Sequence, residues 1–239
     1  MHRLARAGLK ACTTVLATAV TLGVLATPPA HAQKSFNFYI GGFTPKGEDG
    51  RTSDDVLVNN LDFLVFNIKD FNAPTLGGEY LVGLGDKFEA GLGVGFQTKS
   101  VPSVYANFVN SNGSEIEQTL KLRVIPVAAT IRFLPLGNRD AFTPYIGAGV
   151  GIFRWRYAET GEFLATDRTI FRGNFVGDGT ATGPVILGGV RIPVGRTVGL
   201  GGELRYQAAK GDLPADQDFA GTKIDLGGFT YTFTLNFRF

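Results

Sequence analysis

The sequence has 239 residues, of which 44% are hydrophobic, and its 23 Lys and Arg against 21 Asp and Glu give a formal net charge of +2. Three of the basic residues lie among the first 32, so the rest of the chain holds 20 basic and 21 acidic side chains, which excludes the basic excess of a nucleic-acid-binding protein. No segment beyond residue 32 has the run of about 18 to 20 apolar residues of a membrane helix, which excludes a helical membrane protein. A transmembrane barrel is still allowed, because alternating strands average to a neutral hydropathy like the mean of +0.09 found here.

The first 32 residues have the organisation of a secretory signal peptide. A basic start (Arg3, Arg6 and Lys10) precedes an apolar run over 11–26, and Ala30-His31-Ala32 is a small-residue cleavage site. An uncleaved anchor is the alternative, but the run is interrupted by threonines and is short for a bilayer. We therefore expect a cleaved signal peptide over 1–32 and a mature domain over 33–239 that contains no histidine and no cysteine.

Beyond residue 32, eight segments alternate apolar and polar residues with the period of two that predicts a β-strand. In chain order they are 35–44, 76–85, 88–98, 119–133, 143–157, 183–194, 197–208 and 223–239. Short turns at 86–87, 137–140 and 195–196 alternate with long polar connections. An even number of strands joined alternately by short and long connections is typical of bacterial outer-membrane barrels and not of soluble β-sandwiches.

Two of the segments appear in the pattern as broken alternations. In 119–133, Lys121 and Arg123 can share the inner face with Arg132 only if the strand slips by one residue, and Pro126 is where a bulge would fit. A similar slip after Ile152 would turn alternate residues of 143–157 around. It would place three aromatic residues toward lipid and two arginines inward: Phe153, Trp155 and Tyr157, and Arg154 and Arg156.

The last segment, 223–239, has the most regular alternation. Every second residue near the C-terminus is large and apolar or aromatic: Phe229, Tyr231, Phe233, Leu235, Phe237 and Phe239. Their neighbours are polar. So many apolar side chains on one face of a strand require an equally long apolar surface, which a lipid bilayer supplies.

This pattern resembles the small outer-membrane β-barrel proteins, the class that includes OmpX, OmpW and the membrane domain of OmpA. The C-terminal residues Tyr231, Phe233, Leu235, Phe237 and Phe239 are similar to the signal by which the outer-membrane assembly machinery recognises such proteins, and the glycine-rich segments 88–96 and 145–151 are also typical. The resemblance implies an all-β fold, an eight-stranded antiparallel up-and-down transmembrane barrel in the outer membrane. It also implies a monomer whose partners are outer-membrane lipids and the barrel assembly machinery.

The interior of such a barrel is expected to carry a charge cluster. A barrel of about eight strands is just filled by side chains, so a porin-sized pore is not expected. The cluster could be a constriction for a solute or a salt-bridged plug, and we favour the plug because buried charges require partners. Inward glycines in 91–95 and 147–151 could open a cavity beside it or only relieve crowding. The predicted lumen charge cluster is Glu79, Glu89, Arg132, Arg191, Glu203 and Arg205.

Catalytic chemistry is not expected. The known enzymes among small outer-membrane barrels resemble one another in using a histidine, and 33–239 has none. Without histidine or cysteine only an oxygen-ligand metal site remains conceivable. Its candidate ligands are four acidic residues: Glu48, Asp49, Asp54 and Asp55. We interpret this acidic run as a solvated loop, so no metal and no cofactor are predicted.

The long connections leave the function open. The connection 45–75 has an apolar centre, and 159–182 mixes Phe163, Phe171 and Phe175 with charges, so both could be self-packed caps or partner surfaces. Three aromatics are expected to be interfacial anchors: Trp155, Tyr157 and Tyr206. The sequence thus predicts a non-enzymatic outer-membrane barrel that is envelope-structural or allows restricted passage of small, including hydrophobic, molecules. The alternative is a surface recognition protein that acts through its long extracellular loops.

Overall fold

A computed structural model of the chain describes residues 33–137 and 142–239. The predicted signal peptide and positions 138–140 of the predicted turn lie outside these residues. Among the described residues, no helix has the length and apolar character needed to span a membrane.

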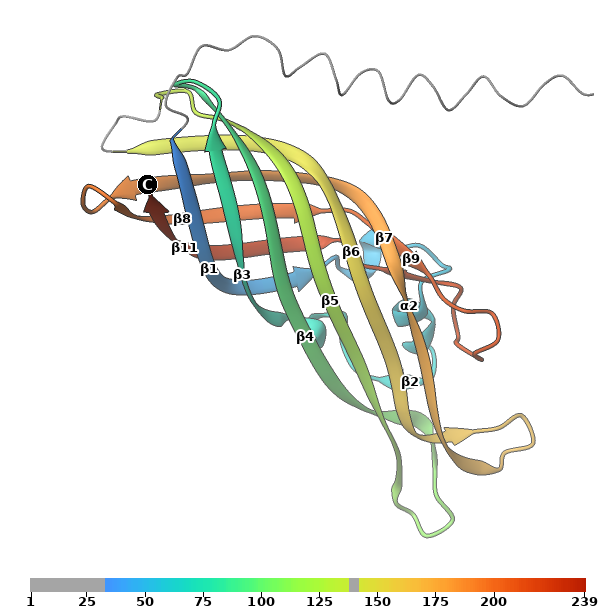
Figure 1. Ribbon diagram of the computed structural model, residues 1–239. Helices are drawn as coiled ribbons and strands as arrows, with labels where there is room; N and C mark the ends of the chain where they lie inside the picture. Colours follow the sequence, from blue (N-terminus) through green and yellow to red (C-terminus); the bar gives the residue numbers. More distant parts are fainter. Residues whose placement is uncertain (1–32, 138–141) are drawn as a thin grey trace, which may run out of the picture. The chain divides into compact units, whose positions relative to one another are not determined.

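Eight antiparallel strands form a closed ring (Figure 1). Each strand pairs with its sequence neighbour in the ring, and the last strand pairs with the first from Ser35↔Arg238 to Pro45↔Gly228. Every predicted strand is present, which confirms the eight-stranded up-and-down barrel. The strands are β1 (Lys34–Pro45), β3 (Ala73–Gly83), β4 (Phe88–Val109), β5 (Glu115–Phe133), β6 (Thr143–Leu164), β7 (Ile170–Pro193), β8 (Val198–Gln207) and β11 (Gly228–Arg238).

A band of exposed apolar side chains surrounds the end of the barrel that carries the short turns. On β11 the predicted alternation is confirmed, and Phe233 is 80% exposed on the outer face. On β5 the outer apolar face runs from Phe133 to Ile125. The eight residue-to-residue steps from Ile125 to Phe133, at about 3.4 Å each and tilted by about 40°, cover about 20 Å along the barrel axis, close to the thickness of a transmembrane apolar band.

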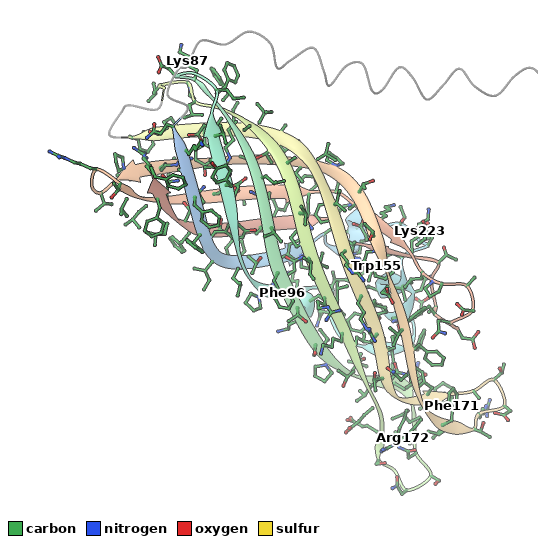
Figure 2. The ribbon with its side chains drawn as sticks, viewed as in Figure 1. Lys87, Phe96, Trp155, Phe171, Arg172 and Lys223 are labelled. Carbon is green, nitrogen blue, oxygen red and sulfur yellow. The ribbon has the colours of Figure 1, made fainter. Side chains whose placement is uncertain are left out.

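Four of the strands continue far beyond this band. Strands β4, β5, β6 and β7 have 22, 19, 22 and 24 residues, whereas the other four have 10 to 12. The predicted loop 159–182 is therefore mostly strand, since β6 and β7 pair as far as Leu164↔Ile170. Figure 2 shows Lys87 in a short turn at one end of the molecule and Phe171 and Arg172 at the opposite end.

The predicted slip at Pro126 is wrong. Strands β5 and β6 stay in one register through this point, with Ile125↔Arg154, Pro126↔Phe153 and Val127↔Ile152 as partners. The surroundings of the two strand faces change at this point, whereas the register of the strand does not. Beyond the apolar band the outer face meets water and the inner face packs on other parts of the chain, so polar and apolar residues exchange faces without a bulge. Four side chains predicted to face inward are consequently exposed on the outside: Lys121, Arg123, Arg154 and Arg156.

Because the faces exchange in this way, two of the three predicted interfacial anchors are wrong. Trp155 is 2% exposed and Tyr157 is 0% exposed, and both belong to the apolar core together with Phe153. The prediction failed because it assumed that lipid surrounds the whole length of β6. Tyr206 does lie on the outer face, where its ring packs 4.9 Å from that of Phe229; its role as an anchor stays a prediction.

Two connections form a cap on the inner faces of the long strands (Figure 1). The cap comprises residues 46–72 and 208–227, and its apolar residues share one core with inner residues of β4 to β7. The apolar centre of the first connection, 45–75, thus packs within the molecule as a self-packed cap, which was one of the two predicted alternatives. Its elements are η1 (Glu48–Gly50), α2 (Val56–Asn60), β2 (Leu64–Val65), η2 (Ile68–Phe71), β9 (Lys210–Asp212) and β10 (Lys223–Asp225).

Asp55 joins the two halves of the cap, so the interpretation of this acidic run as solvated is wrong at this position. Its carboxylate accepts hydrogen bonds from Leu57 N (2.9 Å), Asp225 N (2.6 Å) and Arg51 Nη1 (2.9 Å). The first of these caps the N-terminus of α2. Burial raises the pKa of Asp55, and the neighbouring Arg51 opposes that shift.

Candidate functional site

The first candidate site is the predicted charge cluster inside the barrel. The Arg132 guanidinium contacts Glu79 and lies 2.7 Å from Glu203. Arg205 binds the other oxygen of Glu203 at 2.8 Å and lies 3.6 Å from Glu79. Tyr145 completes this network by donating its hydroxyl to Glu203 at 3.0 Å. Two arginines and two glutamates, drawn from three strands, therefore compensate one another in the lumen.

A second ion pair lies beside this network. Arg191 on β7 contacts both oxygens of Glu89 on β4 at 3.0 Å. Glu89 and Arg132 are register partners on neighbouring strands, but their side chains bind other groups. The Tyr145 ring lies between the two clusters, 4.7 Å from the Arg132 guanidinium carbon and 5.6 Å from that of Arg191. The structure thus brings all six predicted lumen residues into two adjacent ion-paired groups.

The inward glycines do not open a channel next to these charges. A Cβ at Gly91 would meet Thr130 and Glu79, and one at Gly95 would meet Tyr39. Neighbouring side chains thus occupy the space that the glycines leave. A cavity of about 20 Å³, which is room for about one water molecule, lies beside Glu203 and Arg205 and is lined by barrel strands. The geometry therefore favours the plug over the constriction.

Steric relief at one inward glycine is testable by substitution. A Cβ at Gly149 on β6 would overlap the Ala129 carbonyl oxygen of β5, and a paired strand cannot move aside freely. We expect Gly149→Ala to lower the free energy of unfolding by about 1–3 kcal/mol, measured by urea titration in lipid vesicles. Gly202→Ala is the matched control, because the nearest atom to its Cβ would be Thr232 O at 3.7 Å. Equal losses in both variants would contradict the steric role.

The second candidate site is a groove between the ends of the long strands and the cap, which we call the aromatic groove. It has a volume of about 660 Å³. It lies at the end of the barrel opposite the short turns, so a membrane-inserted barrel presents it to the extracellular side. Its lining includes six aromatic side chains: Phe63, Tyr105, Phe108, Phe163, Phe171 and Phe175.

Aromatic contacts fix the walls of this groove. The ring of Phe163 lies 5.8 Å from Phe171 and 4.7 Å from Phe175, across the β6–β7 hairpin. On the other wall, Phe63 of the cap lies 5.7 Å from Tyr105 of β4. The Tyr105 hydroxyl accepts a hydrogen bond from Leu164 N at 3.2 Å and so ties β4 to the hairpin. Phe108 and Phe171 stay exposed within the groove.

Two of the polar side chains that line the groove, those of Gln118 and Glu159, are buried. Gln118 donates from Nε2 to the Glu162 carbonyl at 3.0 Å, but its buried Oε1 has no partner among the described residues. The Glu159 carboxylate accepts from Asn60 Nδ2 at 2.7 Å and from the Tyr157 hydroxyl at 2.8 Å. Burial raises the pKa of Glu159, although both hydrogen bonds oppose the shift. The groove thus offers an apolar surface with hydrogen-bond acceptors at its edge.

The raised pKa of Glu159 predicts a pH-dependent stability. Because the folded state holds this proton more tightly than the unfolded chain, the carboxyl contributes stability at low pH that is lost as the pH rises through the folded pKa. We expect Glu159→Gln, which keeps an acceptor for Asn60 and Tyr157, to be more stable than the wild type at pH 7, by about 1.4 kcal/mol for each unit of the shift. Below the ordinary glutamate pKa of 4.5 this difference should vanish in urea titrations.

The matched control for this prediction is Glu117→Gln, since Glu117 is exposed on the outer face of β5. Its urea midpoint should stay within error of the wild type at both pH values. A Glu159→Gln variant that is less stable than the wild type at pH 7 would contradict the proposed cost of burying this carboxylate.

Sequence reasoning identified only part of the aromatic groove. It singled out Phe163, Phe171 and Phe175 but missed Tyr105 and Phe108 of β4. The missed signal is the continued period of two beyond residue 98, which places Val101, Ser103 and Tyr105 on the inner face of β4. Among the described residues, no cluster of His, Cys, Asp and Glu side chains could hold a metal ion.

Comparison with known proteins gives structural matches only. No protein-family profile matches the chain, and no curated protein sequence gives a significant match. The outer membrane protein OprG from Pseudomonas aeruginosa is similar over 87% of this chain and 96% of its own, with 14% identity and a TM-score of 0.52. Neisserial surface protein A matches with 12% identity and a TM-score of 0.46 over 87% of this chain and 97% of its own. The outer membrane protease OmpT from Escherichia coli matches with 12% identity and a TM-score of 0.46 over 91% and 99%.

At such low identity the likeness to OprG extends to the fold alone. This likeness agrees with the closed ring of eight antiparallel strands described above. The chain folds as a small outer-membrane β-barrel, which confirms the resemblance drawn from its sequence.

Proposed function

We propose that this protein is a closed, non-enzymatic outer-membrane barrel that recognises small aromatic or apolar molecules in its extracellular aromatic groove. In this proposal the signal peptide over 1–32 directs export. The assembly machinery then reads the C-terminal strand, and the protein acts as a monomer among outer-membrane lipids. Of the two functions predicted from sequence, surface recognition is therefore preferred over passage through the lumen.

The aromatic groove is the observation that carries this proposal. Its volume of about 660 Å³ lies within the range of about 300–1,000 Å³ for small-molecule sites. Such sites are mostly apolar with a few polar groups that fix the orientation of the ligand, and the unpartnered Oε1 of Gln118 is one such group. A ligand with an aromatic body and one N–H or O–H donor fits this chemistry.

The closed lumen argues against passage as the main activity. A solute would have to separate Arg132 from Glu79 and Glu203, and both carboxylates are buried. Breaking buried, hydrogen-bonded ion pairs is costly because each charge is then left without a partner. In planar bilayers the wild-type protein should accordingly show no discrete conductance.

Binding of indole tests the proposal. Indole has an aromatic body and one N–H donor, and its binding to the protein in lipid nanodiscs can be followed by saturation-transfer NMR. We expect binding to the wild type and at least several-fold weaker binding to Phe171→Ala. Phe142→Ala is the matched control, because Phe142 is exposed and directly precedes β6, at the end of this strand opposite the groove. Indole binding that Phe171→Ala leaves unchanged, or discrete conductance of the wild type, would overturn the proposal.

A further inference from the structure

A cluster of basic side chains lies on the outer face of the barrel, apart from the lumen and the aromatic groove. We call it the outer basic patch, and its four members are Lys121, Arg123, Arg154 and Arg156 on β5 and β6. All four side chains are exposed. Within the bounds of β1, β3, β8 and β11, the one outward Lys or Arg is Lys34, the first residue of β1, at the end of the barrel that carries the short turns. At the level of the patch, the positive charge is therefore confined to one side.

The patch begins where the apolar band ends. On β5 the outer face changes from Val127 and Ile125 to Arg123, and on β6 it changes from Ile152 to Arg154. Since the long strands point away from the short turns, this boundary corresponds to the outer leaflet. Basic side chains directly beside the apolar band lie at the level of the lipid headgroups.

The charges of the patch are not compensated within the described part of the chain. Arg123 and Arg156 are direct register partners on neighbouring strands, an arrangement of like charges that is unfavourable without an anion. None of the four residues makes an ion pair with another described residue. Asp178 of β7 is the register partner of Arg156 and is the one carboxylate that lines the same hollow of about 60 Å³ as the three arginines. An excess of positive charge remains.

We propose that the outer basic patch binds the phosphate groups of a phosphorylated lipid in the outer leaflet. Arginine side chains bind phosphate through two parallel N–H···O contacts, and Arg123 and Arg156 lie opposite each other around one hollow. A lipid is favoured over free phosphate because the patch continues directly into the apolar band, so one molecule places its headgroup on the arginines and its acyl chains on Ile125 and Ile152.

Lipid A that carries two phosphates is the probe, with the same lipid after dephosphorylation as its matched partner. Binding to the detergent-solubilised, folded protein can be measured by native mass spectrometry across a lipid titration. We expect Arg123→Gln/Arg156→Gln to bind the phosphorylated lipid about thirtyfold more weakly than the wild type does. The control Lys69→Gln/Arg172→Gln removes the same charge at two exposed positions outside the patch and should bind like the wild type.

A folding control and three binding results complete the test of lipid binding by the outer basic patch. Removing two opposed like charges should not impair folding, so the double variant should keep the mobility shift on heating that folded barrels show in SDS gels. Equal binding of phosphorylated and dephosphorylated lipid A, or unchanged binding by the double variant, would overturn the proposed phosphate binding. Inorganic phosphate that displaces the lipid at equal concentration would identify free phosphate as the ligand and overturn the assignment to a lipid.

Discussion

Arg132→Met is expected to lower the free energy of unfolding by about 3–5 kcal/mol, because it leaves two buried carboxylates with one arginine between them. Arg132 is fully buried and contacts both Glu79 and Glu203. Arg205 contacts the same two glutamates and cannot neutralise both. Urea titration of the refolded barrel in lipid vesicles, followed by circular dichroism, measures the loss.

Two comparisons separate charge from packing in this experiment. Arg132→Met/Glu79→Gln removes one charge of each sign and leaves the Arg205–Glu203 pair intact, so it should recover most of the lost stability. Arg172→Met is the surface control, since the Arg172 side chain is 87% exposed and its effect should stay within about 0.5 kcal/mol. If Arg132→Met costs less than the surface control, the ion-paired plug does not stabilise the barrel.

Trp155→Ala is the second large effect, with an expected loss of about 3–5 kcal/mol. The indole ring lies in the core between the long strands and the cap, where added Cβ atoms at Gly179 and Gly211 would meet it. Its removal leaves a cavity that a strand paired on both sides cannot collapse to fill. Urea titration by circular dichroism, together with the rate of protease cleavage within residues 46–72, measures the loss in barrel and cap.

The control for this substitution is Tyr206→Ala, which removes an aromatic ring from the outer face. This variant should leave the protease resistance of the cap unchanged. The two variants would behave alike if Trp155 were an interfacial anchor, and that result would contradict the buried position.

The barrel itself could be predicted because its signal is local. Each transmembrane strand alternates between lipid and lumen over about ten residues, and the alternation of β11 from Phe229 to Phe237 is readable without any knowledge of its neighbours. The paired charges were also predictable as a group, since Glu79, Arg132 and Glu203 all occupy inward positions. Which carboxylate each arginine binds depends on side-chain reach across the lumen, and the sequence does not contain this information in any local pattern.

The part of the long strands beyond the apolar band was mispredicted for one physical reason. The alternation of β5 and β6 is continuous, but the solvent on the outer face changes from lipid to water near Ile125 and Arg154. A pattern read under the assumption of lipid throughout then requires a bulge that does not exist. The cap and the aromatic groove depend on contacts between segments far apart in the chain, such as Asn60 with Glu159 and Asp55 with Asp225, so periodicity alone could not reveal them.

The fluorescence of Trp155 tests most directly the claim that the long strands leave the membrane and enclose an apolar core. Trp155 is the single tryptophan of the sequence, so the tryptophan emission reports one position. In vesicles of lipids brominated at different depths of the acyl chain, we predict a blue-shifted emission that neither the brominated lipids nor aqueous acrylamide quench strongly. Quenching that is strongest for bromines near the headgroups would place Trp155 at the lipid interface and contradict the account.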